Sequence, residues 1–499
     1  MVRRDLKRFV LAATIAAIGV FYFSTIREGH DWGSDFCQYI QYARNIVEHH
    51  DYKKINYKYL YDPEFTQKTP RAAPPVFPML LAPVYRYWGL DLRAMKIEVI
   101  GFFLGFLCIL AGMLQDRLRF RYVLSMVILL GFNPLFWVFK DQILTDLPFL
   151  FFAYLSLWMT KRLYGTFASP RRQSFFAGLV GFCFYLAYGT RRAGLLLPLS
   201  FLVSESMKPA LPKKCLVWTV LSFLAFAIPQ GVFLNESHRP FFSFAADTEA
   251  VLENLRSGYQ ILRNLWGTGN EVWISRGVFL SALALSLAGF FWNLKTEPVL
   301  FKIFRVFFVF YLGTVFVLSS TTARYFFPVL PIYLFYLLRG IERIGLWKRQ
   351  IGKALFVLFI GVALVSYARS YFHFDYGPMT WGVGKKESVE LFDYLQKHTD
   401  PNDIFIFRKP PVLALFAQRQ ASAYQDPADD RFLWDYFRKI RATHIIVGRV
   451  FKDDQRRLAP FVAQYPNDLE RVFSNTDFNV YRIRSYPAWD LIGRRHPAV

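Results

Sequence analysis

Apolar stretches long enough, or nearly long enough, to cross a lipid bilayer recur throughout the first 370 residues of the chain. A spanning helix needs about 20 mostly apolar residues, because the hydrocarbon core of a bilayer is about 30 Å thick. The chain has 499 residues, 54% of them hydrophobic and only 19% charged. We therefore predict a membrane all-α helical bundle of about eleven transmembrane helices, at 9–26, 94–114, 121–138, 143–160, 174–190, 193–205, 215–234, 276–293, 303–320, 324–341 and 351–370.

The formal net charge of +23 would ordinarily suggest a nucleic-acid partner. Residues 371–499, however, hold 19 Lys and Arg against 16 Asp and Glu, so this polar part is nearly neutral. The basic excess belongs to the apolar part of the chain. We therefore predict no nucleic-acid partner.

The distribution of the cations predicts which side of the membrane each loop occupies, since cytoplasmic loops are enriched in Lys and Arg. With a cytoplasmic N-terminus, the inner segments carry 22 Lys and Arg: 1–8, 115–121, 161–172, 206–214, 294–305 and 339–353. The outer segment 27–92 is balanced at eight basic and eight acidic residues. The pattern predicts a membrane protein whose N-terminus is a cytoplasmic, uncleaved signal anchor and whose C-terminus lies outside. We expect a location in the bacterial inner (plasma) membrane.

Three segments are expected outside the membrane. Residues 27–92 form a first outer loop with an amphipathic juxtamembrane helix beginning at Asp35, and 235–275 form a second large outer loop. Residues 371–499 alternate helical and strand patterns, as in KESVELFDYLQKH, DIFIF, HIIVG and FNVYRI, and predict a small soluble periplasmic α/β domain. The expected domains are therefore 1–370, a multi-span transmembrane domain, and 371–499.

Asp146, in FKDQILTDLPFLFF, lies at the expected outer mouth of the fourth span. A carboxylate at a membrane face must be solvated by water, paired with a cation or part of a functional site. One interpretation is a site carboxylate that faces an outer cavity. The alternative is a helix N-terminal residue favoured by the helix dipole, with Thr145 as the cap. Asp141 lies nearby, and we expect Lys140 to pair with it.

Three cations lie on the expected outer side, although Lys and Arg generally gather in the cytoplasmic loops. They are Arg191 and Arg192, in YGTRRAGLL, and Arg324, in TTARYFFPVLP. A phosphate ligand would explain them, because a guanidinium matches phosphate oxygens bidentately. The alternative is an interfacial side chain that reaches toward lipid phosphates. Arg71 is a weaker candidate of the same kind, for which a solvated loop is the alternative.

In order along the chain, these features resemble the GT-C glycosyltransferases that use polyprenyl-phosphate-linked sugars, such as aminoarabinose transferases and protein O-mannosyltransferases. The resemblance rests on Asp-x-x-x-Tyr at Asp35 and Tyr39, APPVFPMLLAPVYRYWGL, DQILTDLPFLFF and ARYFFPVLPIYLF. The aminoarabinose-transferase pattern has Glu-Lys before its Pro-Pro element. Here TPRAAPP places Arg71 at the Lys position without an acidic partner, which argues against an aminoarabinose substrate.

The resemblance implies a glycosyltransferase with Asp35 as the catalytic base and Asp146 as a second catalytic acidic residue. It also implies that Tyr39, Arg71, Arg191, Arg192, Arg324 and Tyr325 bind substrate. The implied partners are a polyprenyl-phosphate-linked sugar donor, membrane lipids and a glycan, lipid or protein acceptor. No cofactor is predicted, and no residue pattern indicates a metal site or a divalent cation.

Two alternatives to single-sugar transfer stay open. A transporter or flippase for a lipid-linked substrate would be expected to show repeated halves and charges near the membrane midplane. The chain has no detectable repeat, and its unusual charges fall at one face. A ligase that moves a glycan from a lipid to a polymer would use the same chemistry as the predicted enzyme with a different acceptor.

Overall fold

The computed structural model describes residues 2–60, 67–68, 72–165, 167, 169–207, 209–234, 248–266, 272–292, 299–318, 322–424 and 429–487. Arg71 and much of the expected outer loop 235–275 lie outside these residues. The chain divides into two compact units. The helical unit consists of Met1–Ile26, Pro74–Leu80 and Arg93–Tyr376, and the α/β unit consists of Arg27–Ala73, Leu81–Leu92 and Gly377–Val499. Most of the expected first outer loop is therefore grouped with the C-terminal residues.

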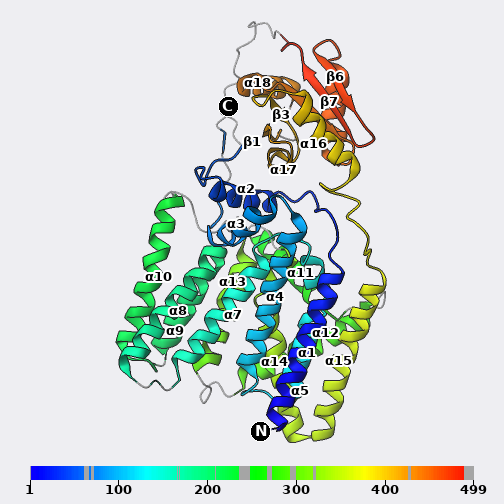
Figure 1. The fold of residues 1–499 in the computed structure, drawn as a ribbon. Coiled ribbons are helices and arrows are strands. Elements are labelled where there is room, and N and C mark those ends of the chain that lie inside the picture. The colour runs from blue at the N-terminus through cyan, green and yellow to red at the C-terminus, as the bar shows by residue number, and fades with distance from the viewer. Residues whose placement is uncertain are drawn as a thin grey trace. The chain divides into compact units, whose positions relative to one another are not determined.

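The helical unit is built from long helices, and each of the eleven predicted spans overlaps at least one of them (Figure 1). The helices are α1 (Val2–Ser24), α4 (Leu92–Leu114), α5 (Phe120–Gly131), α6 (Pro134–Phe139), α7 (Asp146–Leu163), α8 (Pro170–Thr190), α9 (Leu196–Met207), α10 (Lys213–Leu234), α11 (Thr248–Asn264), α12 (Val272–Phe291), α13 (Val299–Val317), α14 (Leu330–Trp347) and α15 (Arg349–Phe372), with 3₁₀ turns η1 (Arg192–Leu195) and η2 (Ala323–Phe326). α3 (Val76–Trp88) is shared between the two units. α8 packs against both α7 and α10.

Four helices in the described part of the chain are long and apolar enough to cross a membrane by length and composition. They cover Asp5–Ser24, Leu92–Leu114, Lys213–Leu234 and Arg349–Phe372. The helical, membrane-type character of this unit is thus confirmed, whereas the number of eleven spans stays a prediction.

The stretch 121–138, expected to be one span, is two helices. α5 ends at Gly131, and α6 begins at Pro134. Proline has no N–H to donate within a helix and is well placed at a first helical position. The Asn133 side chain accepts the Leu135 N–H at 2.9 Å, which caps the new helix. The expectation of one continuous span was therefore wrong at this position.

The α/β unit contains a seven-stranded sheet in the order β2-β1-β4-β3-β5-β7-β6. The strands are β1 (Tyr57–Leu60), β2 (Gln67–Lys68), β3 (Ile404–Ile406), β4 (Gln420–Ser422), β5 (His444–Gly448), β6 (Leu469–Ser474) and β7 (Phe478–Ile483). β1, β4, β3 and β5 run parallel, and β7 and β6 close the edge antiparallel. The C-terminal sheet is thus extended by two strands from the segment that follows the first helix.

Five helices complete the α/β unit: α2 (Asp35–Val47), α16 (Lys386–His398), α17 (Pro410–Phe416), α18 (Asp430–Ile440) and α19 (Lys452–Gln464). Apolar residues of α18 and α19 pack on β5 to form the core, with Trp434, Phe437 and Phe461 at its centre. The α/β character expected for the C-terminal residues is confirmed, and α16, β3, β5 and β7 occupy the expected segments.

Candidate functional site

Three predicted residues, Asp146, Arg191 and Arg324, come together in the helical unit. Asp146 is the first residue of α7, and Arg191 directly follows the last residue of α8. Arg324 lies in η2, just before α14. Because α7 and α8 are antiparallel neighbours, the start of one and the end of the other meet at the same end of the unit.

The Asp146 side chain is only 2% exposed and forms an ion pair with Arg191, whose Nη1 contacts Asp146 Oδ1. Arg324 Nη1 lies 3.8 Å from the other oxygen, Oδ2, which accepts no hydrogen bond within the described residues. One buried carboxylate therefore faces two guanidinium groups. Thr145 precedes α7, but its side chain forms no capping hydrogen bond. The interpretation of Asp146 as a helix N-terminal residue capped by Thr145 was therefore wrong about the cap.

Tyr325 contacts both guanidinium groups through its ring. The Arg191 Cζ atom lies 4.9 Å from the ring centroid, and the Arg324 Cζ atom lies 5.7 Å from it. Such cation–π contacts favour a cation over the ring face. Tyr311, on α13, is buried and interacts electrostatically with Arg191, and nothing in its sequence context distinguished it beforehand. Arg192, also predicted, begins η1 and is half-buried.

Two local features hold the backbone of this cluster in place. Gly194 lies so close to the end of α8 that a Cβ atom there would approach the Ala187 carbonyl carbon to 2.4 Å, so only glycine fits this turn. The Tyr154 hydroxyl of α7 donates a hydrogen bond to the Pro328 carbonyl at 3.0 Å. The first contact fixes the segment that carries Arg191, and the second ties the segment that follows Arg324 to α7.

Asp35 and Tyr39 belong to the α/β unit. Asp35 is the exposed first residue of α2, as predicted, and Tyr39 lies one turn later, half-buried. Residues four apart lie on the same helix face, so the two side chains are neighbours on the surface of α2. The apolar residues Phe36, Cys37 and Ile40 are fully buried. That face of the helix is therefore covered by protein. The sequence had predicted an amphipathic helix beside the membrane, without this protein cover.

The segment that leads to Asp35 is bound to the residues that open the C-terminal part of the α/β unit. The Met379 N–H donates to the Glu28 carbonyl at 3.0 Å, and the Val383 N–H donates to the His30 carbonyl at 2.9 Å. Gly382 makes this approach sterically allowed, because its φ is +148° and a Cβ there would come within 1.9 Å of the His30 carbonyl oxygen.

Trp32, three residues before Asp35, is buried among aromatic rings of the same unit. Its ring centroid lies 5.2 Å from that of Phe451 and 5.8 Å from that of Phe478. Aromatic burial of this kind is among the stronger apolar contributions to packing. The start of α2 is thereby anchored to the sheet domain.

Lys409 is a further charged residue of this region that the sequence did not indicate. It lies at the start of α17, and burial and the neighbouring Arg408 lower its pKa, while Asp31 and Asp35 act in the opposite direction. Arg408 itself forms an ion pair with Asp453. The exposed end of α2 thus lies in the electrostatic field of a half-buried lysine.

The expected pair between Lys140 and Asp141 is confirmed, at 2.5 Å between Nζ and Oδ2. Lys96 of α4 lies 3.8 Å from the same carboxylate, and all three side chains are buried. In the part of the chain that the structure describes, no three His, Cys, Asp or Glu side chains gather as metal ligands do.

Comparison with known proteins gives a likeness in fold alone. No family model matches the sequence, and no curated protein matches it. The structure is similar to that of ArnT from Cupriavidus metallidurans bound to undecaprenyl phosphate, with a TM-score of 0.62, 12% identity, and coverage of 94% of this chain and 97% of ArnT.

The structure is also similar to the oligosaccharyltransferase of Archaeoglobus fulgidus in its apo form, with a TM-score of 0.59 and 12% identity over 89% of this chain and 69% of that one. The same archaeal enzyme, AglB, in complex with an inhibitory peptide and dolichol-phosphate gives a TM-score of 0.57 at 11% identity, over 88% of this chain and 69% of that one. Both neighbours have the GT-C fold. This chain therefore has the GT-C fold, as the resemblance in sequence predicted.

Proposed function

We propose that the protein is an integral-membrane glycosyltransferase that transfers a single sugar from a polyprenyl-phosphate donor to an acceptor hydroxyl. In this proposal the N-terminus is cytoplasmic, and the reaction takes place at the outer, periplasmic face of the bacterial inner membrane. The ArnT structure holds undecaprenyl phosphate and an AglB structure holds dolichol-phosphate, so lipid phosphates are bound by at least two proteins of this fold.

The observation that carries the proposal is the Arg191–Asp146–Arg324 cluster. Two guanidinium groups would repel each other, and the buried carboxylate that faces both offsets this repulsion. Both groups also lie near the ring of Tyr325. A pair of guanidinium groups suits the phosphate of a lipid donor, whose negative charge increases as the sugar departs.

Asp35 is proposed as the general base. The acceptor oxygen attacks the anomeric carbon and forms the new glycosidic bond while its proton passes to the Asp35 carboxylate. The bond between the anomeric carbon and the phosphate oxygen breaks, and its electron pair leaves with the polyprenyl phosphate. A single displacement of this kind inverts the anomeric configuration. Asp35 is an exposed carboxylate at the start of a helix, and such a group can accept the proton of an acceptor hydroxyl. Asp146 is buried and forms an ion pair with Arg191.

Asp146 is accordingly proposed as a positioning residue that holds Arg191 and Arg324, in place of the catalytic role that the resemblance implies. Arg191, Arg192, Arg324 and Tyr325 are proposed to bind the donor phosphate, and Tyr39, beside Asp35, is proposed to contact the acceptor or the sugar. Arg71 stays a candidate from the sequence alone.

The test is a transfer assay with purified full-length protein and a panel of polyprenyl-phosphate sugars. Wild type is compared with Asp35→Asn and with the matched control Asp51→Asn, which changes an exposed aspartate just beyond the end of α2. We expect a loss of at least about 100-fold in kcat for Asp35→Asn, the usual contribution of a general base, and less than about twofold for Asp51→Asn.

Two outcomes would contradict this account in different ways. Full activity of Asp35→Asn would exclude the base assignment and leave the transferase proposal intact. Movement of the donor lipid across the membrane without formation of a glycosidic bond would instead favour a flippase.

A further inference from the structure

A large basic cavity lies at the end of the helical unit opposite the Asp146 cluster. It has a volume of about 1290 Å³ and is lined by the start of α1, the end of α4, the start of α5, the end of α7 and the start of α8. Asp146 begins α7, whereas Lys161 and Arg162 lie in its last turn. A helix of this length extends about 27 Å at 1.5 Å per residue. The cavity is therefore separate from the proposed reaction site.

Five cations and one carboxylate line the cavity: Lys7, Arg8, Arg119, Lys161, Arg162 and Asp116. Lys161 Nζ lies 2.7 Å from Asp116 Oδ2 and also donates to the Met113 carbonyl at 2.8 Å. Burial alone would raise the pKa of Asp116, but the hydrogen bond and charge of Lys161 outweigh it, so this pKa is lowered. Asp116 is thus an anion engaged by Lys161.

Arg119 is engaged as well, since its Nε lies 3.4 Å from Glu342 Oε1. Lys7, Arg8 and Arg162 form no ion pair within the residues that the structure describes, and all three are exposed. Three of the five cations, Lys7, Arg8 and Arg162, are therefore compensated by neither Asp116 nor Glu342.

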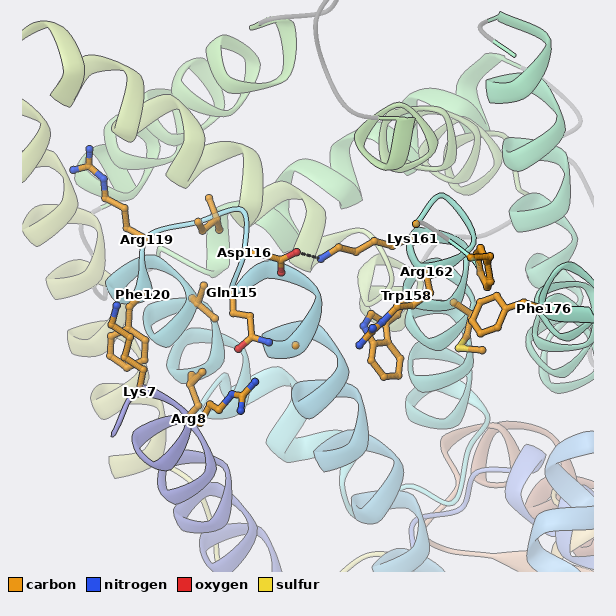
Figure 2. Close-up of a pocket in the computed structure, with 17 residues that line it drawn as sticks. Lys7, Arg8, Gln115, Asp116, Arg119, Phe120, Trp158, Lys161, Arg162 and Phe176 are labelled. Atoms are coloured by element: carbon orange, nitrogen blue, oxygen red, sulfur yellow. Dashed lines mark hydrogen bonds and ion pairs between the residues drawn. The ribbon is translucent and has the colours of Figure 1, made fainter. Parts of the chain in front are cut away.

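Apolar side chains also line the cavity, and four of them are aromatic: Phe120, Trp158, Phe167 and Phe176. Figure 2 shows Lys7, Arg8 and Phe120 on one side, Trp158, Arg162 and Phe176 on the other, and the Asp116–Lys161 pair between them. The Arg162 Cζ atom lies 5.3 Å from the Trp158 ring centroid, and Lys7 Nζ lies 5.9 Å from that of Phe120. The cations thus lie at the edge of apolar surfaces on both sides.

We propose that this cavity binds the phosphate head group of an acidic membrane phospholipid, held between Arg8 and Arg162 with its acyl chains against the apolar walls. Basic pockets between membrane helices select anionic head groups by charge. A soluble phosphate would satisfy the cations and leave the aromatic walls uncovered, which is why a lipid is the better fit. Two of the lining helices, α1 and α4, are among those apolar enough to span the membrane.

The site does not depend on the proposed activity, so it can be tested without turnover. Purified full-length protein in a neutral detergent is titrated with dioleoyl phosphatidylglycerol, and the rise in its thermal unfolding midpoint gives an apparent Kd. Each cation near an anionic head group is expected to contribute about fivefold in affinity, which corresponds to about 1 kcal/mol. The double variant Arg8→Gln/Arg162→Gln is therefore expected to bind roughly 25-fold more weakly.

Two variants serve as controls. Lys348→Gln/Arg349→Gln removes two exposed cations from another predicted inner segment, outside the cavity, and should leave the Kd within about twofold. Arg8→Lys/Arg162→Lys keeps both charges and should retain most of the binding, which separates lost charge from lost folding.

Three results would overturn the proposal. In the first, both glutamine double variants weaken binding equally, which would indicate a diffuse charge effect. In the second, inorganic phosphate raises the unfolding midpoint as phosphatidylglycerol does, which would indicate a soluble anion site. In the third, undecaprenyl phosphate binding is lost in Arg8→Gln/Arg162→Gln while phosphatidylglycerol binding is unchanged, which would indicate a second site for the donor lipid.

Discussion

Asp146 and Arg191 depend on each other for stability as well as for the proposed chemistry. A buried carboxylate without a partner is strongly destabilising, because the charge has lost its water and gained nothing in return. Arg191 supplies that partner, and Arg324 stands 3.8 Å from the second oxygen. Asp146, which is proposed to hold a phosphate-binding guanidinium group, would thus destabilise the helical unit if it lost its partners.

Substitution of Arg191 by Gln is expected to destabilise the protein by about 3 kcal/mol, because it leaves the buried Asp146 charge with only the more distant Arg324 as a partner. The double variant Asp146→Asn/Arg191→Gln removes that charge and should recover at least about half of the loss. Thermal unfolding of the four proteins in detergent measures this double-mutant cycle. Additive losses in the double variant would show that the two side chains act independently.

The candidate residues of this cluster could be predicted one by one but not as a cluster. The sequence singles out Arg191 and Arg324 because they are cations on the expected outer side of the membrane, where cations are few. It singles out Asp146 because it is a carboxylate at the expected end of a membrane span. Their mutual pairing depends on how α7, α8 and η2 pack, which no local pattern encodes. Tyr311 and Lys409 were missed for the same reason, since a tyrosine in an apolar helix and a lysine in a loop have no distinctive context.

At the scale of elements, the start of α2 is held by the C-terminal part of the chain. Backbone hydrogen bonds join Glu28 and His30 to residues 379–383, and Trp32 is buried among rings of the sheet domain. This arrangement gives the C-terminal residues a physical role, which is to fix the position and direction of the helix that begins with Asp35.

Asp454 makes the stability of that sheet domain depend on pH. Burial raises its pKa to about 6 from an ordinary value near 3.8, although Tyr424 and the Gly448 N–H donate hydrogen bonds to it. The folded state therefore holds this proton more tightly than the unfolded state does. The contribution of Asp454 to stability is therefore greatest below about pH 4 and is lost as the pH rises through about 6, by about 3 kcal/mol in all.

Hydrogen exchange of the β5 amides in the full chain measures this effect as an opening free energy at each pH. The Asp454→Asn variant should show a flat profile between pH 4 and 7, while Asp435→Asn, on the outer side of α18, should behave as wild type does. A wild-type profile without any fall between pH 4 and 6 would contradict the assignment.

Elements with a strong local signal were predictable, and those that rely on distant partners were not. The amphipathic period after Asp35 predicted α2, and β-branched and aromatic runs predicted β3, β5 and β7. β1 and β2, in contrast, belong to a Tyr- and Lys-rich segment whose strand character arises from pairing with β4, about 360 residues away in the chain. Pro134 marks the break at Asn133, but the apolar residues on both sides of it favoured the prediction of one continuous span.

At the scale of the whole molecule, the charge distribution predicts orientation. Single cysteines are introduced at Asp51 and at Lys348 in a chain whose four native cysteines are replaced, and right-side-out vesicles are treated with a membrane-impermeant maleimide. We expect immediate labelling at position 51 and labelling at position 348 only after permeabilisation, since the basic segments are proposed to face the cytoplasm. The reverse pattern would invert the proposed topology.

The central claim is that the chain breaks the bond between a sugar and a polyprenyl phosphate and forms a glycosidic bond in the same event. The most direct measurement is therefore the amount of free polyprenyl phosphate released and of glycosylated acceptor formed by purified protein, quantified in the same reaction. Wild type is expected to release one lipid phosphate per sugar transferred, with inverted anomeric configuration, and Asp35→Asn is expected to form both products at least about 100-fold more slowly. Release of lipid phosphate without a new glycosidic bond, or no release from any donor of the panel, would contradict it.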